Sequence, residues 1–208
     1  MAERLGRVRE RIEAAGGRDV RVVGVTKGHS VAAVRAGVAA GLVDLGENYA
    51  KELEGKAEAL AATCTEVRWH MIGQLQTNKV RTVAPHVSMV QTVDRPALVD
   101  ELGKRAPGLA VLVQVNLAGD PLRGGCSWDD AARIVESAGD AGLVVEGLMG
   151  VAPQAEPGEV RAAFARLAAL RERLGLRELS IGMSGDLDIA VGEGATMVRI
   201  GTAIFGER

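Results

Sequence analysis

The chain has 208 residues, enough for one sizeable core and close to the lower end of what a barrel of eight β/α units requires. Its 25 lysines and arginines nearly balance 27 aspartates and glutamates, and the formal net charge of −2 gives no broad electrostatic reason to expect nucleic acid or an anionic membrane as a partner. Aromatic residues make up only 2%, so alanine, valine and leucine must fill the interior. The function must therefore reside in a local site.

The first predicted element is a charged amphipathic helix at residues 1–15, ended by a pair of glycines. This start is unlike the apolar core of a signal peptide, and no segment reaches the roughly 18 uninterrupted apolar residues that a membrane span requires. The two cysteines, Cys64 and Cys126, lack the spacing of a disulfide framework or a zinc site. We expect a cytoplasmic protein without a structural metal.

Short apolar segments then alternate with amphipathic ones. The predicted strands are residues 21–26, 42–45, 67–72, 87–91, 110–115, 144–149, 179–183 and 197–200. The clearest helices between them are residues 31–40, 47–62, 96–105, 128–141 and 159–174. Strands that are apolar on both faces, each followed by a helix, are typical of a parallel sheet covered on both sides. We predict a single α/β domain over residues 1–208, a (β/α)8 TIM barrel with an additional N-terminal helix.

Several helix ends are marked in the sequence. Asp94 is expected to cap the helix that has Pro96 in its first turn, and Ser127 is expected to cap the next helix. The glycines at positions 41, 142 and 175 are expected to end three other helices. Residues 152–158, which include two prolines, are expected to form a long loop.

Lys27 stands at the end of the first predicted strand, and in such a barrel the working residues gather at the carboxyl ends of the strands. An amine that is partly removed from water at such a position is a nucleophile towards aldehydes, as in Schiff-base lysines. The alternative is a lysine that only extends from the strand into water.

The seventh and eighth strands end in small and hydroxyl residues. Barrels commonly bind a phosphate in the loops after these two strands, on backbone amides at a helix start. Ser184 follows the seventh strand, and Gly201 and Thr202 follow the eighth. The alternative for each of them is ordinary helix capping.

Arg199 lies within the eighth strand. Period-two alternation places it on one face with Met197 and places the two β-branched residues on the other face. If those residues meet the helices, Arg199 points into the barrel. A cation beside a cofactor ring would keep a pyridine nitrogen unprotonated, because protonation would place two positive charges together, and the ring would be a weaker electron sink. The alternative is an ion pair with a carboxylate such as Glu47.

Six separated blocks, in order along the chain, resemble the YggS/PROSC family of pyridoxal 5′-phosphate homeostasis proteins, a family similar to the barrel domain of alanine racemase. The blocks are residues 22–27, 46–48, 69–79, 147–149, 182–186 and 196–206. The resemblance implies pyridoxal phosphate as the cofactor, held as a Schiff base on Lys27. It also implies a phosphate bound by Ser184, Gly201 and Thr202, and a ring nitrogen facing Arg199. The other residues implied to line the ring pocket are Asn48, His70 and Met183.

The chain departs from the family at two places. Lys27 is followed by Gly28, where many members have threonine and a nearby proline, so a more flexible loop is expected. Arg123 stands where members often have a lysine, whose role must fall to the arginine or be lost. We interpret His29 and Cys126, two further polar groups near the barrel mouth, as incidental.

The first hypothesis is a carrier or buffer of pyridoxal phosphate in vitamin B6 homeostasis, with little turnover of its own. The resemblance implies that alanine racemases complete their site with a second, β-rich domain and a partner subunit, which supplies an acid/base tyrosine. This chain ends at residue 208, and Tyr49 is its only tyrosine. We expect a monomer that binds neither nucleic acid nor membrane, with pyridoxal-phosphate-dependent apo-enzymes as recipients of the cofactor.

Three alternatives stay open. One is a single-domain pyridoxal phosphate enzyme such as a slow amino-acid racemase. Another is a barrel aldolase whose lysine takes a sugar-phosphate carbonyl, although such lysines usually lie later in a barrel. A pure interaction protein is the third, and it would not need a lysine and an arginine at one barrel mouth.

Overall fold

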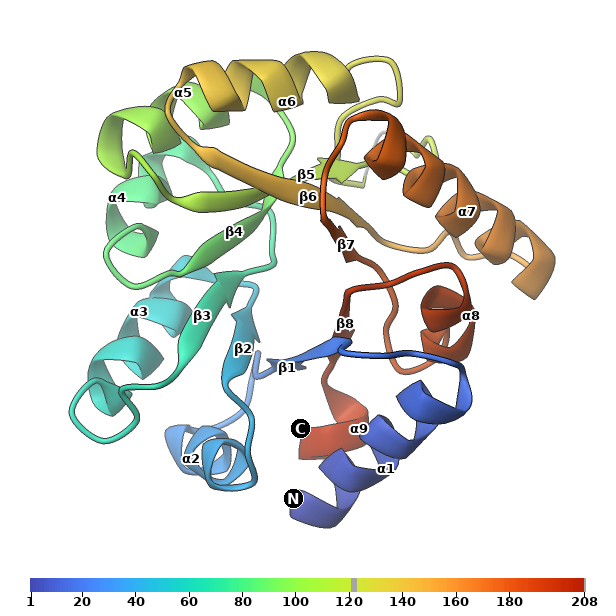
Figure 1. Cartoon of the computed structure of the whole chain (residues 1–208). Coiled ribbons are helices and arrows are strands. Elements are labelled where there is room, and N and C mark those ends of the chain that lie inside the picture. The colour runs from blue at the N-terminus through green and yellow to red at the C-terminus, as the bar shows by residue number, and fades with distance from the viewer. Residues whose placement is uncertain (121–122, 208) are drawn as a thin grey trace.

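Eight parallel strands form a closed barrel in the computed structural model, which describes residues 1–120 and 123–207. Each strand pairs with the next in sequence, and β8 closes the ring against β1 (Figure 1). The predicted fold class is confirmed. The strands are β1 (Arg21–Val25), β2 (Asp44–Glu47), β3 (Arg68–Met71), β4 (Met89–Val93), β5 (Ala110–Val115), β6 (Val144–Gly150), β7 (Glu178–Ser180) and β8 (Met197–Ile200).

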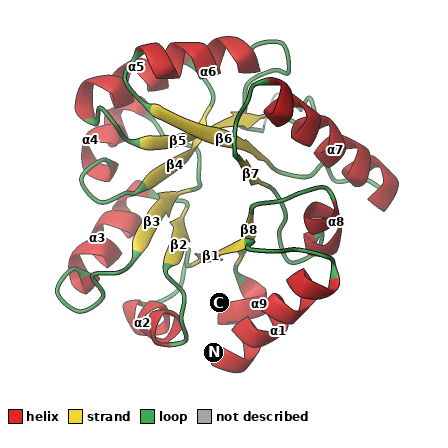
Figure 2. Cartoon of the chain, viewed as in Figure 1, coloured by secondary structure: helices red, strands yellow, loops and turns green. Residues whose placement is uncertain are grey.

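Helices surround the barrel on its outside (Figure 2). They are α1 (Ala2–Ala14), α2 (Val31–Ala39), α3 (Ala50–Leu60), the 3-10 helix η1 (Thr77–Lys79), α4 (Val80–Val83), α5 (Pro96–Arg105), α6 (Ala131–Asp140), α7 (Pro157–Arg173), α8 (Leu187–Gly192) and α9 (Thr202–Phe205). The additional helix α1 packs against α8 and α9, which are both short. Among the described residues, no helix is both long enough and apolar enough to span a membrane.

Apolar side chains fill two separate regions. Inside the barrel, a small cluster contains the side chains of Val23, Met89, Leu112, Met149 and Met197. A much larger cluster lies between the strands and the helices and includes Val198 and Ile200 of β8. Burial of each such side chain contributes about 1.5–3 kcal/mol to folding. Because Met197 lies inside and Val198 and Ile200 lie outside, the alternation of β8 directs Arg199 into the barrel.

Several helix ends lie where the sequence predicted them. Gly41, Gly142 and Gly175 follow the ends of α2, α6 and α7 with φ angles of +94°, +79° and +65°. A residue with a Cβ is strained in that left-handed conformation, so glycine stops each helix there.

The predicted caps at Asp94 and Ser127 are wrong. Arg95 occupies the N-cap of α5, and the Asp94 carboxylate instead accepts hydrogen bonds from the Arg95 guanidinium (2.6 Å) and from the backbone N–H of Gly125 (3.2 Å). The Ser127 hydroxyl accepts from the N–H of Asp130, but α6 begins only after Asp130. Ser127 therefore closes a turn before the helix.

Other boundaries shift by a few residues. The predicted long loop ends at Glu156, since Pro157 is tolerated in the first turn of α7, where no helical N–H bond is lost. β4 lies two residues later than predicted. β7 ends at Ser180 rather than Met183, because Gly182 has a φ of +94° and turns the chain.

Candidate functional site

Lys27 lies in a tight turn directly beyond β1. The Thr26 carbonyl accepts a hydrogen bond from the N–H of His29 (3.0 Å), which makes Lys27 and Gly28 the two central residues. Gly28 has a φ of +75°, the conformation that the third position of a type II turn requires. The half-buried Lys27 is thus carried by a hydrogen-bonded turn, and the more flexible loop expected from the sequence stays a prediction.

The Arg199 side chain is only 5% exposed and is held inside the barrel. Its Nη1 donates to the carbonyl and to the hydroxyl of Ser180, both at 2.7 Å, and its Nη2 donates to the Gly150 carbonyl at 2.8 Å. A guanidinium has five N–H donors. Two of them are therefore without a protein acceptor in the part of the chain that the structure describes.

The charge of Arg199 is not cancelled by an ion pair within the described residues. Glu47, the predicted alternative partner, pairs with Lys56 at 2.6 Å. Burial lowers the pKa of Arg199 to about 10, and the negative charge of Asp186 opposes this shift. That pKa still lies well above neutral pH, so Arg199 is a buried cation with donors to spare.

Ser180 connects Arg199 to a chain of hydrogen bonds across the barrel interior. The Ser180 hydroxyl donates to Gln91 Oε1 (2.7 Å), and Gln91 Nε2 lies 2.9 Å from His70 Nδ1. His70 Nε2 lies 2.9 Å from Asp44 Oδ1, and Asp44 also accepts from Arg68. With Gln91 as the donor to Nδ1, the His70 ring carries its hydrogen on Nε2 and donates it to Asp44. Both ring nitrogens are thus engaged.

Asp44 anchors the far end of this chain. Burial by itself raises the pKa of the Asp44 carboxyl, but hydrogen bonds from His70 and Arg68 outweigh it and lower the pKa to about 2. The sequence predicted His70 as a site residue and missed Gln91 and Ser180. Both are polar residues within apolar strands, and such residues need buried partners, which was the available signal.

The predicted phosphate residues lie at the ends of the adjacent strands β7 and β8. The Gly182 carbonyl accepts from the N–H of Arg199 (2.9 Å), so the segment leading to Ser184 runs beside β8. Gly201 lies against the end of β1, since a Cβ there would be 3.4 Å from the Val25 carbonyl oxygen. The structure thus brings Ser184, Gly201 and the exposed Thr202 to the same end of the barrel as Lys27.

Asn48 and Met183 line two different cavities at this end. Asn48 lines one of about 460 Å³ together with the exposed Tyr49. Met183, which is 41% exposed, lines one of about 370 Å³. Neither cavity includes Lys27 or Arg199 in its lining. The structure therefore does not gather all the predicted residues around one cavity.

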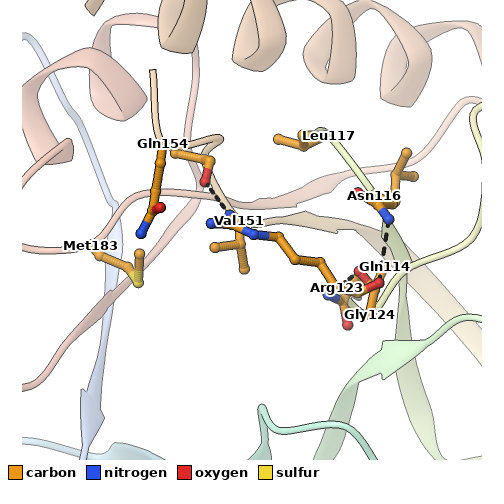
Figure 3. A pocket seen from close by; sticks show the side chains of 10 residues that line it. Gln114, Asn116, Leu117, Arg123, Gly124, Val151, Gln154 and Met183 are labelled. Carbon is orange, nitrogen blue, oxygen red and sulfur yellow. Dashed lines mark hydrogen bonds between the residues drawn. The ribbon is translucent and has the colours of Figure 1, made fainter. Parts of the chain in front are cut away.

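Arg123 lies across the Met183 cavity. Figure 3 shows Gln154 and Met183 on one side of it and Asn116 on the other. The Arg123 guanidinium donates to the Ala152 carbonyl at 3.0 Å, so this side chain ties together the loops that follow β5 and β6. Cys126, three residues later in the sequence, is buried, and burial raises the pKa of its thiol to about 12. Cys126 is thus a poor nucleophile.

A family model described as alanine racemase, N-terminal domain, matches residues 1–208. The pyridoxal phosphate homeostasis protein of Pseudomonas aeruginosa is 44% identical, over 100% of this chain and 94% of its own length. The protein of the same name from Aquifex aeolicus is 38% identical, over 99% and 97%.

Solved structures give the same grouping. PipY of Synechococcus elongatus with PLP bound is 32% identical, with a TM-score of 0.87 and coverage of 99% of both chains. Alanine racemase from Corynebacterium glutamicum is 16% identical, with a TM-score of 0.74 over 100% of this chain and 62% of the racemase. At that identity the racemase shares the fold alone.

Proposed function

Since this chain belongs to the pyridoxal phosphate homeostasis proteins of the alanine racemase N-terminal domain family, we propose that it binds pyridoxal 5′-phosphate as a Schiff base on Lys27 and buffers the cofactor in the cytoplasm. The observation that carries the proposal is the full-length match to a relative whose structure contains the bound cofactor. When bound, pyridoxal phosphate supplies an aldehyde for condensation with an amine and a ring that can withdraw electrons.

The donor set of this chain fits that cofactor. Arg199 is a buried cation with two N–H donors left over, and a pyridine nitrogen is an acceptor that one of them can satisfy. Because protonation of the ring nitrogen would place a second positive charge beside Arg199, the arginine holds that atom unprotonated. Lys27 supplies the amine from the end of β1, the strand that pairs with β8. The residues that bind the phosphate are Ser184, Gly201 and Thr202.

The remaining assigned residues act at the edge of the ring pocket in this proposal. Asn48 and Met183 flank it from the ends of β2 and β7. Both ring nitrogens of His70 already have partners, so His70 contacts the cofactor ring through carbon atoms and acts on Arg199 through Gln91 and Ser180. This gives His70 a supporting role rather than that of a proton donor.

As a carrier, the protein is expected to turn over little substrate of its own. An unprotonated ring nitrogen weakens the electron sink that racemisation needs, and the single tyrosine, Tyr49, is 65% exposed. We therefore assign a carrier that releases pyridoxal phosphate to apo-enzymes that depend on it, and we propose that it acts as a monomer.

A transfer experiment tests this function. The protein loaded with pyridoxal phosphate is mixed with an apo-aminotransferase, and recovery of transaminase activity is compared with that from an equal amount of free cofactor. We expect the apo-enzyme to be reactivated fully. In parallel, L-alanine is incubated with the loaded protein in heavy water. Rapid exchange of the α-proton would contradict the carrier proposal and favour the alternative, a racemase that uses the same site.

A further inference from the structure

Lys56 is a buried lysine that no step of the proposed function uses. It lies on α3 and is 5% exposed. Its Nζ donates to the Thr26 carbonyl (2.6 Å), to Glu47 Oε1 (2.6 Å) and to Glu52 Oε1 (2.7 Å). An ammonium group has three donors, so each has an acceptor. With its donors occupied and its nitrogen covered, Lys56 does not compete for an aldehyde.

These contacts hold the backbone on both sides of Lys27. On the preceding side, Lys56 binds the Thr26 carbonyl, and the Thr26 hydroxyl donates to Glu47 Oε1 (2.5 Å). On the following side, the N–H of Gly28 donates to Glu52 Oε1 (2.6 Å). Lys27 is therefore one of the two central residues of a turn, and the peptide groups on both sides of Lys27 are fixed by one ionic cluster.

Resting on the proposed function, we propose that Lys56, with Glu47 and Glu52, is a positioning residue that holds the turn so that the Lys27 amine meets the aldehyde of the cofactor. In that condensation the neutral Lys27 amine attacks the aldehyde carbon, its nitrogen forms a C=N bond with that carbon, and the aldehyde oxygen leaves as water with the two hydrogens of the amine. Positioning of reacting groups is worth orders of magnitude in rate, and small displacements remove it.

Stability alone does not account for this cluster. A buried ion pair is often no more stabilising than apolar residues of similar volume, because removing its charges from water is costly. Glu47 is fully buried, its Oε2 has no partner among the described residues, and burial raises the pKa of its carboxyl. The hydrogen bonds of this costly cluster end on the two peptide groups beside Lys27. Positioning of Lys27 therefore explains why the cluster is present.

The test compares Lys56→Met with Lys51→Met, the same substitution at an exposed position of the same helix. Two quantities are measured for each variant and for the unmodified chain: the rate at which pyridoxal 5′-phosphate is captured on Lys27, and the affinity for pyridoxine 5′-phosphate, an alcohol that cannot form the imine. We expect Lys56→Met to slow capture about tenfold or more with little change in pyridoxine phosphate affinity, and Lys51→Met to change neither.

Capture by Lys56→Met at the rate of the unmodified chain would overturn the inference and leave the proposed function standing. An equal loss of both quantities would also overturn it, since it would indicate general damage to the site. If Lys56→Met does not fold, the same two measurements are made on Glu52→Gln, which keeps the ion pair between Lys56 and Glu47. No capture on Lys27 by the unmodified chain would refute the proposed function itself.

Discussion

Ser180→Ala interrupts the buried chain of hydrogen bonds next to Arg199. The Ser180 side chain is fully buried, and its hydroxyl makes two hydrogen bonds of 2.7 Å. It donates to Gln91 and accepts from the charged Nη1 of Arg199. Alanine leaves the Gln91 oxygen without its donor, and one N–H of Arg199 without an acceptor, in an interior that water does not reach.

The expected loss follows from these two bonds. A hydrogen bond to a charged group contributes about 1.5–3 kcal/mol, and an unpaired buried neutral group costs about 1–3 kcal/mol. Arg199 keeps its bonds to the Ser180 and Gly150 carbonyls, which limits the total to about 3 kcal/mol. For a chain of this length that corresponds to a melting temperature lower by about 6–12 °C.

Urea unfolding at neutral pH measures the change in free energy of unfolding. The matched control is Ser88→Ala, since the exposed Ser88 side chain forms no hydrogen bond to any residue the structure describes. We expect the control to stay within about 0.5 kcal/mol of the unmodified chain. A loss of less than about 0.5 kcal/mol in Ser180→Ala would refute the reasoning, because the hydroxyl would then not connect Gln91 with Arg199.

Three further predictions concern acid stability, a close backbone contact and the phosphate residues. The pKa of Asp44 is lowered from 3.8 to about 2 in the folded chain, so its ionised carboxylate contributes about 2 kcal/mol to the free energy of unfolding above pH 3.8. This contribution is lost as the pH falls through 2, and acid unfolding titrations of Asp44→Asn should lack the loss. Gly73→Ala should lower the free energy of unfolding, measured in urea, by on the order of 3 kcal/mol, because its Cβ would lie 2.1 Å from a backbone oxygen. Gly55→Ala on α3, which has open space around it, should raise the free energy of unfolding by about 0.5–1 kcal/mol. Equal effects of the two substitutions would contradict the geometry. Ser184→Ala and Thr202→Ala should each weaken retention of pyridoxal phosphate during dialysis by about 1.5–3 kcal/mol, and unchanged retention in the double variant would remove the proposed phosphate site.

Features that depend on one strand were predictable from the sequence. The bounds of β5 and β8 follow directly from their apolar runs. The inward direction of Arg199 follows from period-two alternation, because Val198 and Ile200 had to face the helices. Local turn and helix-stop signals likewise identified the glycines that end α2, α6 and α7.

Features that depend on contacts between distant elements were not predictable. Glu52 and Lys56 lie four residues apart on a helix, a spacing that indicates an ordinary surface ion pair. Only the approach of α3 to the turn after β1 buries Lys56 and places its Nζ on the Thr26 carbonyl. In the same way, the pairing of Ser180 with Gln91 depends on closure of the barrel, which brings β7 and β4 within reach across its interior.

The most direct test of the central claim is to identify the residue that holds the cofactor. The purified chain is incubated with pyridoxal 5′-phosphate, the imine is reduced with borohydride, and the modified peptide is identified by mass spectrometry. We predict one phosphopyridoxyl group, on Lys27, and loss of this label in Lys27→Ala. A label on another lysine, or no label at all, would contradict the assignment of Lys27 as the anchor of pyridoxal phosphate.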